Sequence, residues 1–189
     1  ARLCGTTASL CGIEKYGFEG NAEGVDRSVR YDITLHAFML SQSGIPVIYS
    51  GDEIGQVNDY SYKNDPNKAA DSRYLHRGEF NWSLAPNRNI ADTVQGKLFH
   101  ALDHLEHIRS AHSVFSTTAS LRTIDTWDSS ILAIVRENDE EKFIGIYNFG
   151  DQDKVAWINE DDGIYTDLIT EHQIEAKGVM IPAFGCFWL

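Results

Sequence analysis

A short apolar run, residues 45–50 (IPVIYS), restricts most strongly how the first half of this chain can fold. The run shows no alternation of apolar and polar residues, which is typical of a strand that is buried on both faces of a parallel sheet. Pro46 stands near its start, where a sheet tolerates proline. The run therefore predicts one strand of a parallel sheet.

The segments on either side of this run have helical periodicity. Residues 25–40 place apolar side chains at helical spacing, and Gly44 follows where that helix ends. Residues 94–108 form a second amphipathic pattern, for which Asp92 is the predicted N-cap with Gln95 three residues later. The order helix, strand, helix predicts a βα-type unit.

A long polar segment, residues 51–91, separates the strand from the second helix. It is rich in Asp, Asn, Ser, Tyr and Arg and has no apolar period, so we expect a loop. Connections in βα units usually need only a few residues, and much longer ones are usually functional. Because the loops at the carboxyl ends of barrel strands build the active site of α/β barrels, residues 51–91 would line a pocket if the strand belongs to such a barrel.

The pattern changes after residue 110. Short segments rich in β-branched and aromatic residues predict strands at 131–135, 143–149, 155–158, 164–169 and 179–189. Acidic turn-like clusters separate them at 138–141, 150–153 and 160–163. This spacing predicts an antiparallel β-sandwich over residues 111–189.

Charge and composition exclude several functional classes. The net charge of −12 gives no electrostatic footprint for a nucleic acid or an anionic membrane surface, and no apolar run is long enough to span a bilayer. The three cysteines have no CxxC spacing, so we expect reduced core thiols rather than disulfides or a zinc site. These features favour a cytoplasmic protein, with bacterial secretion left open, and the N-terminus looks internal to a longer chain.

Several motifs bring a family resemblance into view. Residues 44–55 (GIPVIYSGDEIG) resemble the eighth-strand signature of α-amylase-superfamily enzymes. Residues 2–10 (RLCGTTASL), 58–60 (NDY) and 71–77 (DSRYLHR) are similar to amylosucrases and related sucrose hydrolases, and residues 132–137, 146–149, 181–182 and 188–189 to the sandwich domain that follows such barrels. The resemblance implies that residues 1–110 are the end of a (β/α)8 TIM barrel (seventh helix, eighth strand, long loop, eighth helix), and residues 111–189 a C-terminal β-sandwich.

The resemblance also implies a type of reaction, and it implies that the catalytic residues lie outside this chain. Enzymes of this type are retaining glycosidases or glucosyltransferases acting on sucrose or α-glucans, with no cofactor and no metal. Their catalytic carboxylates lie on strands four, five and seven, which precede the first element recognised here. We therefore expect no catalytic residue in this chain, and no activity from the chain alone.

Arg77, beside His76, is the substrate-positioning residue that the resemblance singles out. In amylosucrases the matching arginine pairs with a carboxylate that closes the pocket floor, and a planar guanidinium is suited to holding carboxylates or sugar hydroxyls. That partner would lie upstream, so Arg77 is expected to be exposed or differently paired. A surface arginine in a loop salt bridge is the alternative.

The other candidates lie earlier in the same loop. Asp52 and Glu53 directly follow the strand, so they are expected to lie at the mouth of the barrel and to support the loop. The alternative is that they act as a catalytic acid and nucleophile, but adjacent residues on an extended chain point to opposite faces and cannot readily share one sugar. A second group combines hydrogen-bonding and ring-bearing side chains suited to sugars, with ordinary loop packing as the alternative. This group is Asn58, Asp59, Tyr60 and Tyr62.

Three further groups of histidines and aromatic residues have simpler interpretations. His100, His104 and His107 have the spacing of a helical metal site but are expected to form a solvated helix face. Phe80 and Trp82 are expected to anchor the loop, or otherwise to line a sugar subsite. The remaining tryptophans, expected in the sandwich core rather than on a sugar-binding platform, are Trp127, Trp157 and Trp188.

Three hypotheses remain open. The first is a piece of a sucrose- or α-glucan-processing enzyme, and the others are a carbohydrate-binding module and a purely structural β-domain. Exposure of Trp127 or Trp157 would favour the binding module. Because a barrel unit without its neighbours leaves strand edges uncovered, we also expect association with the missing N-terminal part or with a second copy, whereas a compact monomer alone at micromolar concentration would contradict this.

Overall fold

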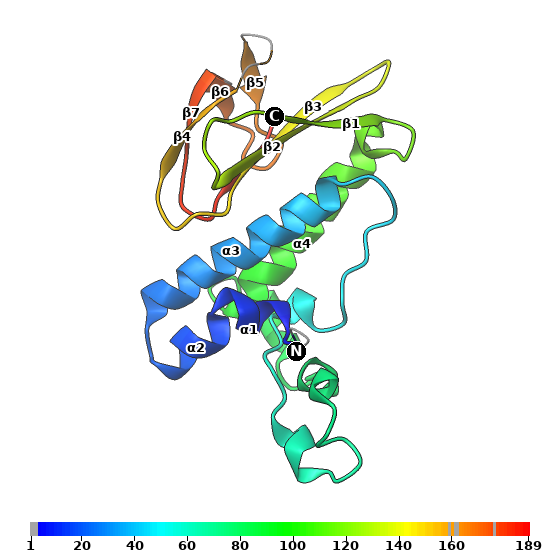
Figure 1. Cartoon of the computed structure of the whole chain (residues 1–189), viewed down its shortest axis with the longest axis vertical. Coiled ribbons are helices and arrows are strands. Elements are labelled where there is room, and N and C mark those ends of the chain that lie inside the picture. Colours follow the sequence, from blue (N-terminus) through cyan, green and yellow to red (C-terminus); the bar gives the residue numbers. More distant parts are fainter. Residues whose placement is uncertain (1–3, 159, 161–162, 176) are drawn as a thin grey trace. The chain divides into compact units, whose positions relative to one another are not determined.

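The computed structural model describes residues 4–158, 160, 163–175 and 177–189 (Figure 1). It divides into two compact units, one formed by residues 1–32 and 47–101 and the other by residues 33–46 and 102–189. The two long helices, α3 (Ala22–Ser41) and α4 (Val94–Ala111), each contribute residues to both units. The predicted domain boundary at 110/111 stays a prediction.

The two predicted helices are confirmed as α3 and α4, preceded by the short helices α1 (Thr7–Cys11) and α2 (Ile13–Phe18). The N-cap of α4 was predicted one residue too early. The Thr93 hydroxyl, not Asp92, accepts the Gly96 N–H at 3.0 Å, and the Thr93 carbonyl accepts the first helical hydrogen bond from Lys97. None of the described helices is long and apolar enough to cross a membrane.

The strand predicted at residues 45–50 is absent from the structure. Residues 45–49 have no assigned secondary structure, and Ile45 and Val47 are 89% and 78% exposed. A strand exists only when its backbone groups pair with a neighbour, and every strand in the described part of the chain lies after residue 119. The described residues therefore form no strand here, because they do not form the sheet that an apolar run of this kind requires, and the assignment of the run to an eighth barrel strand stays a prediction.

The loop prediction for residues 51–91 is confirmed. The described segment holds only 3-10 turns: η1 (Asp52–Ile54), η2 (Ser61–Asn64), η3 (Ser72–His76) and η4 (Ala85–Asn89). Gly55 brings the start of this loop close to α4, since a Cβ on it would lie 2.6 Å from Leu98 Cδ1. Its φ of 60° also favours glycine.

All strands of the second unit are antiparallel. A four-stranded sheet has the order β1-β2-β3-β8, formed by Ser120–Ile124, Ile131–Glu137, Lys142–Asn148 and Cys186–Trp188. Two-stranded ribbons pair β4 (Lys154–Trp157) with β7 (Lys177–Ile181), and β5 (Ile164–Thr166) with β6 (Gln173–Glu175). The sequence missed β1 and β6, and it merged β7 and β8 into one segment. The predicted turn at 160–163 lies partly outside the described residues.

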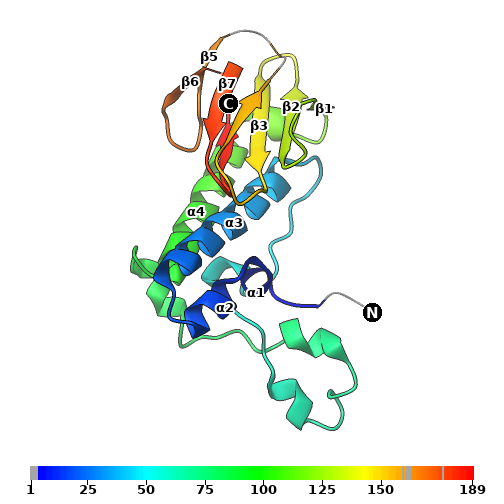
Figure 2. The same cartoon turned by 60° about the vertical axis from the view of Figure 1, so that its left-hand side comes forward.

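Alternating residues of β2 and β3 face two separate cores. One face contacts the β4–β7 ribbon through Ile131, Ala133, Val135, Ile144 and Ile146, which meet Ala156, Val179 and Ile181 (Figures 1 and 2). The other face packs on the unit's helical residues, where Phe143, Tyr147 and Trp188 meet Leu40 and Leu105. The unit is therefore an antiparallel β-domain with one sheet covered on both faces.

The predicted burial of the tryptophans is right for Trp188 and wrong for the other two. Trp188 is fully buried and its indole N–H donates to the Tyr147 hydroxyl at 3.1 Å. Trp157 is 54% exposed because it points outward from β4, next to the inward-facing Ala156. Trp127 is 77% exposed in the turn between β1 and β2, and it has a positive φ of 59°.

The three cysteines carry free thiols. Cys4, Cys11 and Cys186 are free, as expected, but each is only partly buried. Burial raises the pKa of Cys186 to about 12, which keeps this thiol protonated.

The helical histidines at positions 100, 104 and 107 are all exposed, which confirms the solvated face, and the described residues contain no cluster suited to a metal ion.

Arg136 joins the sheet to two helix ends within the second unit. This β2 side chain is fully buried, and its guanidinium donates to the carbonyls of Ser41 and Gln42 at 3.1 Å and of Phe115 at 3.4 Å. The carbonyls at the end of α3 have no intrahelical donors, so the cation satisfies them and complements the helix dipole. Burial lowers the pKa of Arg136, yet an arginine stays charged at working pH.

We predict that Arg136→Ala destabilises the chain by about 3 kcal/mol or more, because several buried carbonyls lose their donor. The matched control is Arg122→Ala, which removes a half-exposed arginine from β1 and should cost about 1 kcal/mol or less. Urea unfolding at neutral pH measures both. Equal losses for the two variants would contradict this role.

A second prediction concerns Glu160, whose carboxylate binds Arg122 at 2.6 Å and Lys142 at 2.9 Å. Hydrogen bonds from Arg122 and then Lys142 lower the pKa of Glu160 from 4.5 to about 2. Because the folded pKa is depressed, this stabilisation is complete above about pH 4.5 and is lost as the pH falls toward 2. Carboxyl NMR titration should give a midpoint near 2 that rises in Arg122→Ala. An ordinary midpoint in the unmodified chain would refute the ion pair.

Candidate functional site

Asn58 connects the long loop to the start of the chain. Its Oδ1 accepts the Thr6 N–H at 2.9 Å, and its own N–H donates to Ser9 Oγ at 2.9 Å. Its amide Nδ2 donates to Glu14 Oε2 at 3.2 Å. Thr6 is also the N-cap of α1, where its hydroxyl accepts the Ser9 N–H. Asn58 thus fixes the first part of the loop against α1 and α2, through both its side chain and its backbone N–H.

Asp59 brings the second part of the loop to the same place. Its N–H donates to the Leu75 carbonyl at 2.8 Å, and Gly78 packs so closely that a Cβ there would lie 2.8 Å from Asp59 Cβ. The carboxylate accepts the Ser61 N–H at 2.8 Å, and hydrogen bonding from Ser61 lowers the pKa of Asp59. The candidates at 58–60 and 76–77 therefore lie close together.

His76 and Arg77 differ in their surroundings. The His76 ring meets Tyr49 edge-on at 5.9 Å, and its Nδ1 is buried without a hydrogen-bond partner among the described residues. Arg77 is exposed. Hydrogen bonds from Arg73 lower the pKa of Asp71 to about 2, with a smaller effect from the charge of Arg77. Arg73 makes the direct ion pair with Asp71, at 2.6 Å, which leaves the Arg77 guanidinium accessible.

Two shallow cavities lie next to residues 58–59. One, of about 320 Å³, is lined by Tyr60 together with Ser9, Glu14 and Phe18. Tyr60 is 52% exposed, and its hydroxyl lies 3.5 Å from Asn58 Nδ2. The other, of about 270 Å³, is lined by Gln56, Val57, Asn58, Asp59, Glu79, Asn81 and Leu84. Both cavities combine carboxylates and other polar side chains with apolar surface, the usual composition of a small-molecule site.

Asp52 and Glu53 have local structural contacts. The Glu53 carboxylate accepts the Gly51 N–H at 2.8 Å, which stabilises the turn at the start of the loop. Asp52 is buried. Burial of the Cys11 thiol raises its pKa, and the charges of Asp32 and Asp52 raise it further. The expected position of these carboxylates at a barrel mouth stays a prediction.

The remaining loop candidates are mostly at the surface. Tyr62 belongs to the turn η2, and Trp82 is 77% exposed with its ring edge-on to Phe80 at 4.7 Å. Trp82 therefore does not anchor the loop to the described part of this chain.

Sequence reasoning missed Ser9 and Glu14 as members of this site. They lie 49 and 44 residues from Asn58 along the chain. No local periodicity predicts contacts between residues so far apart in the chain, although Ser9 belongs to a motif on which the family resemblance rests.

Comparison with known proteins finds a curated relative and several solved structures that this chain resembles. A scan against protein-family models finds no match. The chain is 29% identical over 167 residues to the glucosylglycerate phosphorylase of Escherichia coli K12, which covers 87% of this chain and 28% of that enzyme. The chain thus spans less than a third of this curated relative.

Several solved structures resemble this chain in fold. A maltogenic amylase from S. marinus matches with a TM-score of 0.57 and 21% identity over 85% of this chain and 19% of its own. The trehalose-6-phosphate hydrolase of Bacillus licheniformis matches with a TM-score of 0.61 and 16% identity over 89% and 39%. The structural neighbours are α-amylase-superfamily enzymes. At these identities the likeness concerns the fold.

We predict that Asn58→Ala loosens the loop, because Thr6 and Glu14 each lose a hydrogen-bond partner, whereas the bond from the Asn58 backbone N–H to Ser9 remains. The expected destabilisation is about 1–2 kcal/mol, with faster amide exchange at Thr6. Asn67→Ala, at an exposed position of the same loop, is the control and should change neither. Unchanged exchange at Thr6 in Asn58→Ala would contradict the connecting role.

Proposed function

We propose that this chain is the C-terminal part of a retaining α-glucoside-processing enzyme of the α-amylase superfamily. The loop at 51–91 forms one wall of the substrate pocket, and the catalytic carboxylates lie on barrel strands outside the chain. The similarity to a glucosylglycerate phosphorylase, over only 28% of that enzyme, supports an incomplete active site. The unpaired apolar run at 45–50 supports it independently, since it would be a strand of the completed barrel.

The observation that carries the proposal is the close approach of residues 58–60 and 75–78. The Asp59–Leu75 hydrogen bond fixes the backbone beside His76 and Arg77, so an exposed guanidinium and a buried, unpaired imidazole nitrogen stand on one wall. Held this way, Arg77 would position a carboxylate or sugar hydroxyls in fixed directions. His76 would gain a partner when the remaining part of the pocket is present.

Two reactions fit this arrangement. The motif at 71–77 favours transfer of glucose from sucrose to water or to a glucan, as in sucrose hydrolases and amylosucrases. The curated relative favours phosphorolysis, in which phosphate accepts the glucosyl group. A guanidinium binds phosphate as readily as carboxylate, so Arg77 is compatible with both. A solved neighbour, an isomaltulose synthase from Erwinia rhapontici NX5, was determined with its natural substrate sucrose.

The first test uses the chain alone. Incubated with sucrose, with maltose, or with glucosylglycerate and phosphate, the 189-residue chain should release no glucose or glucose phosphate. Turnover of any of these substrates would show that its own carboxylates catalyse the reaction, and Asp52, Glu53 and Asp59 would then need testing as catalytic residues.

The second test restores the missing part. A chimaera in which this chain replaces the matched segment of the E. coli phosphorylase should process an α-glucoside, and the products from sucrose and from glucosylglycerate distinguish the two reactions. Arg77→Ala should lower kcat/KM about 100-fold, equivalent to about 2.7 kcal/mol of transition-state stabilisation. Arg77→Lys should recover only part of this loss because it lacks the planar fork.

The matched control is Arg73→Ala in the same chimaera. Arg73 is a loop arginine whose side chain is bound to Asp71, and its removal should change kcat/KM by less than threefold. Equal losses for Arg73→Ala and Arg77→Ala would contradict a specific positioning role for Arg77.

A further inference from the structure

We propose that Trp127 is a carbohydrate-binding platform on the β-domain, separate from the loop at 51–91. The ligand is a neutral pyranose of an α-glucan chain, stacked on the exposed indole ring. The site itself follows from the β-domain alone, whereas the choice of an α-glucan rests on the function proposed above.

The conformation of Trp127 is unusual for a structural residue. Its side chain is 77% exposed, and its φ of 59° lies in a region that large side chains rarely adopt. Such strain persists only where the surroundings impose it, and it clusters at binding sites. A tryptophan that neither fills a core nor relaxes its backbone is therefore a candidate for contact with a ligand.

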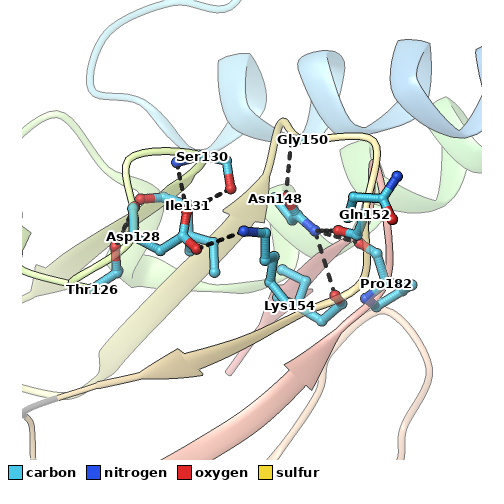
Figure 3. A network of polar contacts seen from close by, with 10 residues as sticks. Thr126, Asp128, Ser130, Ile131, Asn148, Gly150, Gln152, Lys154 and Pro182 are labelled. Atoms are coloured by element: carbon cyan, nitrogen blue, oxygen red, sulfur yellow. Dashed lines mark hydrogen bonds and ion pairs between the residues drawn. The ribbon is translucent and has the colours of Figure 1, made fainter.

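The turn that holds Trp127 is fixed by hydrogen bonds on both sides. The Asp125 carboxylate accepts the Trp127 N–H at 2.9 Å. On the other side the Thr126 hydroxyl donates to the Ile131 carbonyl at 2.8 Å (Figure 3). Asp128 accepts both the N–H and the hydroxyl of Ser130, at 2.9 and 2.7 Å. The ring is thus presented from a rigid turn, which reduces the entropy lost on binding.

A further contact connects the Trp127 turn to β4. Lys154 binds the Asp128 carboxylate at 3.0 Å, and hydrogen bonds from Ser130 and then Lys154 lower the pKa of Asp128 to about 2. Asn148 fixes the turn before Lys154, because its Nδ2 donates to the carbonyls of Gln152 and Pro182 at 2.8 and 3.0 Å (Figure 3). The Trp127 turn is therefore held by both the sheet and the ribbon of this unit.

The chemistry around the ring favours a sugar over other occupants. The neighbouring side chains in the turn are carboxylates and hydroxyls, at Asp125, Thr126, Asp128, Ser129 and Ser130. An exposed aromatic ring in a turn that carries such groups matches a pyranose, whose C–H face stacks while its hydroxyls form hydrogen bonds. A protein partner would require a wider apolar patch, and the acidic groups disfavour an anionic membrane.

The test measures glucan binding by the chain itself. Native electrophoresis through amylopectin gels should retard the chain, and titration with maltoheptaose by calorimetry should give the affinity. Trp127→Ala should weaken both at least tenfold. Trp157→Ala, which removes another exposed tryptophan of the same β-domain, is the matched control and should stay within twofold.

Trp127→Gly separates binding from folding. Glycine adopts a positive φ without strain, so this variant should unfold at the same or a higher temperature while losing glucan binding. No retardation of the unmodified chain, or equal binding by Trp127→Ala, would overturn the proposal. Equal losses in Trp127→Ala and Trp157→Ala would also overturn it. Because binding needs no catalysis, these outcomes are independent of the chimaera's activity.

Discussion

Backbone pairing is the constraint on which this structure depends. The strand β2 and the run at 45–50 are both apolar, yet only β2 forms a strand, because it pairs along its whole length with β3 and over five residues with β1. The run at 45–50 has no such neighbour among the described residues, so Ile45 and Val47 are exposed to solvent. Under the proposed function, barrel strands outside this chain would bury these side chains.

This contrast explains which parts of the fold could be predicted from sequence. The helices α3 and α4 and the strands β2 and β3 follow from local periodicity, which reports the face that a segment buries. The strand β1 was missed because four of its five residues are exposed and its pattern is polar. Trp127 and Trp157 were misplaced because aliphatic residues already fill the space between the sheet and the β4–β7 ribbon. Pairing partners and competition for core volume are properties of the whole fold.

The candidate site was predictable in part for a similar reason. His76 and Arg77 came from resemblance to a family motif, and the structure brings them beside Asp59 through the Leu75 carbonyl. The contribution of Ser9 and Glu14 depends on contacts of Asn58 across more than 40 residues, which no local pattern encodes. The resulting surface has positioning groups and shallow cavities but no proposed catalytic residue. The proposed function accounts for this arrangement as one wall of a pocket that another part of the enzyme would complete.

The most direct test of this account is amide hydrogen exchange at residues 45 and 47–49, measured in the chain alone and in the chimaera with the E. coli phosphorylase. The account predicts rapid exchange in the chain alone under conditions where β2 is protected, and slow exchange in the chimaera, where barrel strands supply partners. Rapid exchange at these residues in a chimaera that is folded and active would contradict it, because the run would then not be a strand of the completed barrel.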